Sequence, residues 1–278
     1  MKKAATIVLF LSWTLLPGLR ADYWHGDFTD DRTFVFSGNS PIYSSPDTGS
    51  EIVVETPAGT EVHISGSAGE ALLDGGFMTY WYQVRAVLSG IEYSGYMPGS
   101  SLAMTAMQLG ADTLFMFSVT GSDPDYGFRS SARILSAGMV LDEVEFRPVD
   151  GGFGQVPYSY SVRSLPLDPE GLQDIRDLVE LSFIYEACGF LNRDILFAWT
   201  GERLIMGPEA DSQFEASEYR YIEDFIMPSD SGGSPGTVMV RTTISEWDEE
   251  IDDYVVKDSY STDHGWTGAE FESEGEPY

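Results

Sequence analysis

The sequence predicts a mainly all-β protein with at most one short helix. Short runs of alternating apolar and polar residues are interrupted throughout by Gly, Pro, Asn and Asp. This pattern is typical of strands joined by turns. In addition, Trp-Thr-Gly occurs twice, in "FAWTGERLI" and in "HGWTGAEFE", each time with a large apolar residue shortly after it. The repeat favours a recurring turn between strands.

The N-terminal segment, residues 1–21, has the features of a secretory signal peptide. Lys2 and Lys3 precede the apolar run 4–16, which is shorter than the roughly 20 residues that span a bilayer. Cleavage is expected after Ala21. The mature protein is therefore expected to be secreted or periplasmic, and to associate with a membrane only if this segment is not cleaved.

The charge balance argues against polyanionic partners. The chain has 45 acidic and 15 basic residues, a formal net charge of −30. Binding to nucleic acid depends on clustered Lys and Arg, so nucleic acid is not expected as a partner. An anionic membrane surface is disfavoured for the same reason.

Nine segments are predicted to be strands because they alternate and are rich in β-branched and aromatic residues. They are Arg32–Ser37, Glu51–Glu55, Glu61–Ser65, Tyr80–Val87, Ser94–Met97, Leu114–Thr120, Tyr158–Val162, Thr237–Glu246 and Tyr254–Ser261. One helix is predicted from Asp168, where Asp-Pro-Glu supplies an N-cap and a proline at the first helical position. Val179–Tyr185 fits a strand equally well.

The two Trp-Thr-Gly sequences are interpreted as tight hairpins. Thr200-Gly201 and Thr267-Gly268 are each flanked by strand-like apolar residues, and a glycine supplies the positive φ that such turns need. The tryptophan before each turn is expected to cover the sheet against Leu204 or Phe271. The repeat therefore predicts a structural joint of a β-meander and not a functional site.

Met107–Asp112 is predicted to link two domains, because the strand pattern resumes only at Thr113. The first domain would cover residues 32–106. The second, residues 113–273, is expected to be a larger β-meander or sandwich-like domain.

Residues 33–104 carry an ordered series of motifs. Ser45-Pro46 stands in an early turn, Gly59-Thr60 precedes a strand, and "WYQV" and "GYMPGSSL" follow. In this order they resemble the bacterial SH3-like (SH3b) domain family, with an insertion at Gly66–Thr79. The resemblance implies a small β-barrel that serves as a binding or spacing module in exported proteins, often near peptidoglycan or peptides. The second half resembles uncharacterised exported β-rich C-terminal domains, which imply no activity.

Four tyrosines are the candidate ligand-binding residues of the first domain. They are Tyr43, Tyr82, Tyr93 and Tyr96. With Trp81 and Val84 assigned to the core, Tyr82 is expected to point outward, near the tyrosines of the next strand. An exposed aromatic strip would suit a sugar ring or an extended peptide, although core packing explains any single tyrosine as well.

Nucleophilic catalysis finds little support in the chain. Cys188 is the single cysteine and lies in an apolar stretch, so a buried, inert thiol is expected. "PSDSGG" resembles the nucleophile loop of trypsin-like proteases, but such a serine needs a histidine base and a buried carboxylate. None of His25, His63 and His264 has the required order or surroundings, so a glycine-rich loop is the preferred interpretation.

No cofactor is expected, and calcium is the one alternative. The acidic segment Asp248–Asp253 and the stretch "GSDPDYG" offer the weak candidate ligands Asp123, Asp125, Asp248 and Asp252. Calcium takes several oxygen ligands, but neither segment has the spacing of a calcium-binding loop. Solvated turns are therefore preferred. One cysteine and three scattered histidines also argue against zinc.

The sequence thus predicts an exported, non-catalytic binding or scaffolding protein of the bacterial cell envelope. Its expected partner is a cell-wall component or an envelope protein or peptide, recognised by the SH3-like barrel. Two alternatives stay open. One is an envelope hydrolase with a carboxylate site in the C-terminal domain, and the other is a purely structural spacer.

Overall fold

The computed structural model describes residue 28 and residues 31–74, 76–123, 127–147, 159–167, 171–185 and 189–274. These residues form strands, turns and a single 3-10 helix, Gly99–Ser101. The predicted all-β fold class is therefore confirmed. No helix in this part of the chain is long and apolar enough to cross a membrane. The predicted signal peptide, residues 1–21, lies outside the described residues.

The strands form three antiparallel sheets. Sheet 1 has the order β1-β4-β5-β6-β2-β3, sheet 2 the order β10-β9-β8-β7, and sheet 3 runs in chain order from β11 to β18. The strands of sheet 1 are β1 (Arg32–Phe34), β2 (Ser40–Tyr43), β3 (Ile52–Thr56), β4 (Glu61–Asp74), β5 (Phe77–Leu88) and β6 (Ile91–Pro98). Those of sheet 2 are β7 (Thr105–Gln108), β8 (Thr113–Asp123), β9 (Gly127–Ser136) and β10 (Met139–Phe146).

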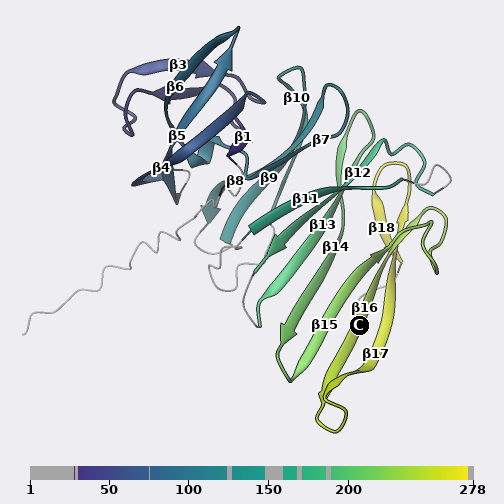
Figure 1. The fold of residues 1–278 in the computed structure, drawn as a ribbon. Helices are drawn as coiled ribbons and strands as arrows, with labels where there is room; N and C mark the ends of the chain where they lie inside the picture. The colour runs from purple at the N-terminus through teal and green to yellow at the C-terminus, as the bar shows by residue number, and fades with distance from the viewer. Residues whose placement is uncertain are drawn as a thin grey trace, which may run out of the picture.

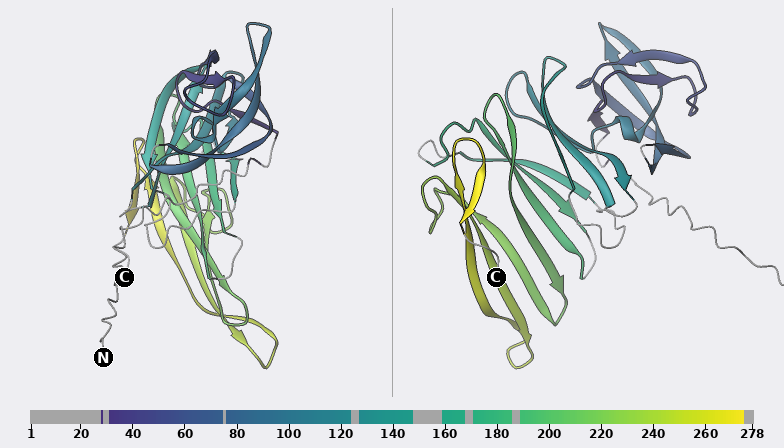
Figure 2. Two further views of the ribbon diagram at one scale, coloured as in Figure 1. Left: turned by 90° about the vertical axis from the view of Figure 1, so that its left-hand side faces the viewer. Right: turned by 180° about the vertical axis from the view of Figure 1, so that it is seen from behind.

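Sheet 3 is an eight-stranded meander. Its strands are β11 (Ser159–Leu165), β12 (Asp177–Ile184), β13 (Leu191–Trp199), β14 (Leu204–Glu215), β15 (Tyr219–Ile226), β16 (Thr237–Asp248), β17 (Asp253–Trp266) and β18 (Phe271–Glu274). The molecule is elongated, with sheet 1 at one end and the tip of the β16–β17 hairpin at the other (Figures 1 and 2).

Each of the nine predicted strand segments overlaps a strand of the structure. The helix predicted from Asp168 is wrong in the described part of that segment, since residues 171–174 form turns and β12 follows from Asp177. The physical reason is that β12 buries both of its faces. Leu178 packs in one apolar cluster, whereas Val179 and Leu181 pack in another. A strand places neighbouring residues on opposite faces in this way, and a helix does not.

Sheet 2 packs against the first four strands of sheet 3. β7 lies closest to β11, and β10 lies closest to β14. The main core fills the space between the two layers and includes Phe115, Phe117, Ile134 and Phe146 from sheet 2 and Leu181, Phe183, Ile195, Phe197 and Trp199 from sheet 3. The backbone amide of Leu204 also donates to the Asp142 carboxylate over 2.7 Å, which fastens β14 to β10. This pairing of layers gives the sandwich-like arrangement that the sequence predicts.

The opposite face of β12–β14 is buried as well. Leu178, Leu196 and Ile205 share a second cluster with residues from the end of the meander, among them Val238 and Phe271. Gly207 allows this contact, because a Cβ at that position would lie only 3.1 Å from the Phe271 ring. Sheet 3 therefore curls so that its last strands cover the back of its first ones. Burial on both faces explains the continuous apolar run before Trp199.

Sheets 1 and 2 pack directly on each other. The linker predicted at Met107–Asp112 is wrong, because β7 already pairs with β8 and the Leu109 amide donates to the Thr113 carbonyl over 2.8 Å within their hairpin. Arg133 of sheet 2 reaches the segment that follows β1, where its Nη1 donates to the Phe36 carbonyl over 2.7 Å. Its guanidinium also lies 4.2 Å from the centre of the Phe36 ring. The two sheets are thus held in a defined relative position.

The two Trp-Thr-Gly sequences form matching hairpin loops, as predicted. Gly201 and Gly268 have φ of 98° and 91°, and each is the first central residue of its turn. The amides of Thr200 and Thr267 donate to the carbonyls of Arg203 and Glu270 over 3.0 Å, so the loops close around Gly-Glu and Gly-Ala and not around Thr-Gly. In both loops the threonine hydroxyl accepts from the two amides that follow the glycine. The joints are therefore alike in side-chain chemistry as well as in backbone.

We expect Gly268→Val to lower the free energy of unfolding by about 1–3 kcal/mol, because valine is strained at positive φ. Space is not the cause, since a Cβ at Gly268 would meet no atom within 4 Å. Thr267→Ser, which keeps the hydroxyl acceptor, is the matched control. Thermal unfolding of both variants tests the argument, and equal midpoints would contradict it.

Candidate functional site

The orientation of β5 corrects the prediction made for Tyr82. Tyr82, Val84 and Ala86 point into the core of sheet 1, and Tyr82 is only 6% exposed. Phe28 packs edge-on against its ring, with 4.8 Å between ring centres. The expectation that Tyr82 faces outward is therefore wrong. Residues 81 and 84 are an odd number apart, so a regular strand cannot place both on the inner face.

The four candidate tyrosines divide between the two faces of sheet 1. Tyr93 lies opposite Ala86, on the inner face, and packs against the core. Tyr43 and Tyr96 lie opposite each other on β2 and β6, and Tyr96 in turn lies opposite the exposed Gln83. Directly paired residues of antiparallel strands share a face. Tyr43 and Tyr96 are therefore neighbours on the outer face.

An apolar row crosses this outer face. Ile52 of β3 lies opposite Tyr43, so it extends the pair to a third strand. Trp81 of β5 points to the same side, and its ring meets that of Tyr43 edge-on with 5.5 Å between centres. We call these four residues, Ile52, Tyr43, Tyr96 and Trp81, the aromatic row. Ile52 is 49% exposed, Tyr43 and Tyr96 are partly exposed, and Trp81 is buried beneath them.

Close contact between β2 and β6 sets the geometry of the row. A Cβ on Gly95 would overlap the carbonyl oxygen of Tyr43 and lie 2.7 Å from the Ile42 side chain. A glycine at this position lets the two strands approach each other. The sequence patterns did not identify Trp81 and Ile52 as members of the site. Counting alternate residues from Val84 would have placed Trp81 outside, but no local pattern shows that β2 pairs with β6.

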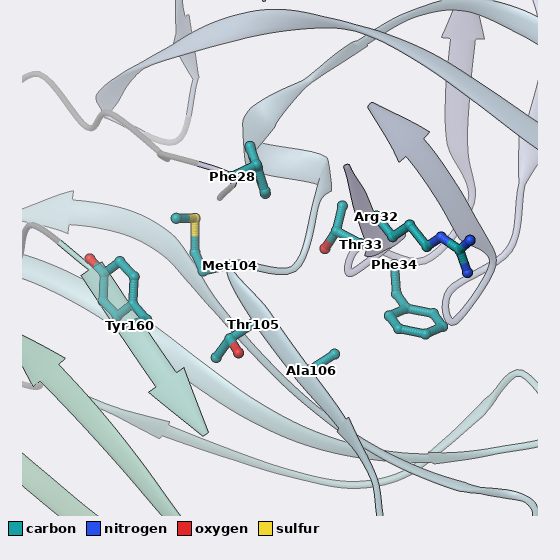
Figure 3. A pocket seen from close by; sticks show the side chains of 8 residues that line it. All are labelled: Phe28, Arg32, Thr33, Phe34, Met104, Thr105, Ala106 and Tyr160. Atoms are coloured by element: carbon teal, nitrogen blue, oxygen red, sulfur yellow. The ribbon is translucent and has the colours of Figure 1, made fainter. Parts of the chain in front are cut away.

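A small cavity of about 100 Å³ lies where β1, β7 and β11 meet (Figure 3). Phe28, Met104 and Tyr160 form part of its wall, together with Thr33 and Thr105. The guanidinium of Arg32 points away from the other side chains in the figure. A volume of this size suits a few water molecules and is below the several hundred Å³ of a typical ligand pocket. We therefore do not assign substrate binding to this cavity.

Sheet 3 holds the carboxylates most relevant to a hydrolase. Glu180 is 4% exposed, and its two oxygens accept from Nε and Nη2 of Arg163 over 2.6 and 2.7 Å. Burial raises the pKa of the nearby Asp194, which also interacts with Ser182 and Glu180. Burial likewise raises the pKa of Asp177. None of these carboxylates lines the cavity described above, and the fork with Arg163 occupies Glu180 in a structural ion pair.

We expect Asp194→Asn to raise the unfolding temperature at pH 7. Because the pKa of Asp194 is raised by burial, the folded protein holds this proton at pH values where the unfolded chain has lost it. The stability contributed by the group therefore falls as pH rises above about 4. An asparagine removes this penalty while its oxygen still accepts a hydrogen bond from Ser182.

Thermal unfolding between pH 4 and pH 7 checks this, and the gain should shrink toward pH 4. Asp224→Asn, at an exposed position of β15, is the control and should change little. A midpoint at pH 7 that is unchanged or lower in Asp194→Asn would contradict the expectation.

The protease-like sequence forms a turn. The carboxylate of Asp230 accepts from the Met227 amide over 2.8 Å, and the Gly233 amide donates to the Asp230 carbonyl over 2.9 Å. The serine between them, Ser231, is exposed in this turn. Asp230 thus shapes the loop, in agreement with the interpretation as a glycine-rich loop. Cys188 lies outside the described residues.

The weak metal candidates do not form a common site where the structure describes them. Asp248 and Asp252 lie at the tip of the β16–β17 hairpin, where Asp248 accepts from the Glu250 amide over 2.9 Å. Asp125 and the side chain of Asp123 lie outside the described residues. Within the described ranges, no three His, Cys, Asp or Glu residues are grouped so that they would hold a metal ion.

We expect that calcium is not required for folding. Unfolding temperatures in chelator and in millimolar calcium should nearly coincide, whereas saturation of a site on the folded state would add about 2–3 kcal/mol. A shift of many degrees would contradict this expectation and make the hairpin tip a calcium site. Asp248→Asn should then abolish the shift.

The chain matches no known protein family, no curated protein and no solved structure in the comparisons made. The fold and the geometry therefore define only a class. It is an all-β protein in which a small six-stranded sheet is joined to a two-layered β-sandwich and carries the aromatic row on its outer face.

Proposed function

We propose that this protein is an exported, non-catalytic binding or scaffolding protein of the bacterial cell envelope. Its aromatic row recognises a cell-wall component or an envelope peptide. The observation that carries the proposal is the alignment of Ile52, Tyr43 and Tyr96 across three neighbouring strands. Partly exposed aromatic and apolar side chains in one line suit the flat face of a sugar ring or the side chains of an extended peptide.

The sequence adds two supports for this proposal. Residues 33–104 resemble bacterial SH3-like domains, and that resemblance implies recognition of peptide or peptidoglycan. The charged and apolar pattern of residues 1–21 resembles a secretory signal, which would deliver the mature chain to the envelope. Cleavage near Ala21 would leave a secreted or periplasmic protein, and an uncleaved segment would anchor it to the membrane.

A hydrolase is the weaker alternative. Its best support is the raised pKa of Asp194 beside Glu180 in sheet 3. Perturbed carboxylates occur in active sites, but they also occur in structural ion pairs. Because Arg163 takes both oxygens of Glu180, a structural role accounts for this pair without catalysis. The binding function is therefore the better-supported proposal, and a structural spacer is what is left if no ligand binds.

The mature full-length chain should co-sediment with peptidoglycan or with the peptide-containing envelope fraction. The double variant Tyr43→Ala/Tyr96→Ala should fold normally and lose retention by about tenfold or more, since aromatic anchors commonly supply a kilocalorie or more each. Tyr260→Ala, which removes a half-exposed tyrosine of sheet 3, is the matched control and should be retained like the wild type.

Two outcomes would overturn the proposal. If the wild-type chain sediments with neither material, the small sheet is a spacer. If the double variant is retained as strongly as the wild type, binding does not involve the aromatic row. Hydrolysis of the peptidoglycan by the wild type, lost in Asp194→Asn, would favour the hydrolase.

A further inference from the structure

The strand that ends the aromatic row is an edge strand. β3 pairs only with β2 in sheet 1, and its other side has no neighbouring strand among the described residues. Two consecutive apolar residues on β3 are exposed, Ile52 at 49% and Val53 at 39%. An edge strand presents unpaired backbone N–H and C=O groups that can bond to another chain. An open edge with exposed apolar residues is the arrangement that accepts another strand.

Pro41 determines the direction in which the backbone N–H and C=O groups of β3 point. Glu55 of β3 lies opposite Pro41 of β2. Because proline has no amide hydrogen, this pair cannot exchange two hydrogen bonds and must be a non-hydrogen-bonded pair. The N–H and C=O of Glu55 therefore point away from β2, toward the open edge. Val53 is the extra residue of the register shift between Ile42 and Tyr43, so it is not paired across the ladder.

The open edge and the aromatic row are continuous. A strand added to β3 would lie about 4.8 Å beyond it, so its side chains on the outer face would fall next to Ile52. The register places Ile52 and Glu55 on the same face as Tyr43 and Pro41, whereas Val54 packs inward. A bound strand would thus present one side chain beside the apolar end of the row and another beside the Glu55 carboxylate.

The charges around the edge select the ligand. Glu51 and Glu55 are both exposed at β3, and Asp47 is exposed in the preceding turn. No Lys or Arg lies between Ile42 and Val84 in the sequence. A peptide with Lys or Arg near its apolar residue would complement these carboxylates. An acidic segment would be repelled.

We infer that β3 binds an extended, basic peptide by strand addition, an inference that rests on the proposed binding function and names its ligand. The peptide backbone bonds to the edge-facing amide and carbonyl of Glu55. One large apolar side chain extends the aromatic row beyond Ile52. A lysine or arginine two positions away pairs with Glu55. Backbone bonds supply affinity and the two side chains supply selectivity.

The test uses the mature full-length chain and a defined probe. The probe is a fluorescein-labelled seven-residue peptide in which Thr alternates with Lys, Tyr and Lys, so that either strand direction places a lysine two positions from the tyrosine. Glu55→Pro removes the edge-facing N–H, and Glu55→Ala removes the carboxylate but keeps the N–H. We expect Glu55→Pro to weaken binding by about tenfold or more and Glu55→Ala by less than about fivefold.

A second measurement does not depend on a variant. On addition of the peptide to the wild type, hydrogen exchange of the Glu55 amide should slow, whereas exchange of the Thr113 amide in sheet 2 should not change. No binding of the probe, equal weakening by Glu55→Pro and Glu55→Ala, or unchanged exchange at Glu55 would each overturn strand addition.

Failure of this inference is distinguishable from failure of the proposed function. If Glu55→Pro is retained on peptidoglycan or envelope material like the wild type, while Tyr43→Ala/Tyr96→Ala is not, the aromatic row binds its ligand without strand addition. If none of the variants changes retention, both the inference and the proposed function fail.

Discussion

The structure depends on aromatic packing between sheet 2 and sheet 3. Phe117 of β8 lies at the centre of this packing, with its ring centre 5.2 Å from that of Tyr160 and 5.3 Å from that of Phe183. Phe146 of β10 adds a contact to Phe117 at 6.0 Å and one to Phe197 at 5.3 Å. These rings come from five strands in two sheets. Such large side chains bury much apolar area and prefer tilted or edge-on contacts, so they fix the position of the two layers.

The same packing determines where the candidate binding face lies. Phe77 of sheet 1 enters the aromatic core, and Arg133 ties sheet 2 to the Phe36 carbonyl. Sheet 1 is therefore packed against the rest of the molecule and is not merely connected to it by a flexible linker. Its outer face, with Tyr43 and Tyr96, is presented in a fixed direction at one end of the elongated molecule (Figure 1). A fixed orientation reduces the entropy lost when a ligand binds.

Local patterns predicted the strands better than they predicted the site. Alternation identified segments such as Thr237–Glu246, and glycine chemistry identified both Trp-Thr-Gly hairpins. β9 was not predicted, because Ser130 and Ser131 are polar yet fully buried. In this strand, burial does not follow the hydropathy of the side chains. The inner and outer faces of β5 were assigned wrongly because two core residues at odd spacing were placed on one side. Tyr43 and Tyr96 are neighbours because β2 pairs with β6, and the alternation within a single strand cannot predict which strands pair.

Gly95 tolerates substitution less than the residues of the site that would contact a ligand. The partly exposed rings of Tyr43 and Tyr96 could be exchanged for other apolar groups with little more than a change in ligand preference. Gly95 could not, because any side chain there would overlap the Tyr43 carbonyl and force β2 away from β6. In related sequences that keep such a site, this glycine should therefore vary less than the residues that touch the ligand. Across related sequences, conservation of Gly95 would therefore indicate the site better than conservation of the side chains that contact the ligand.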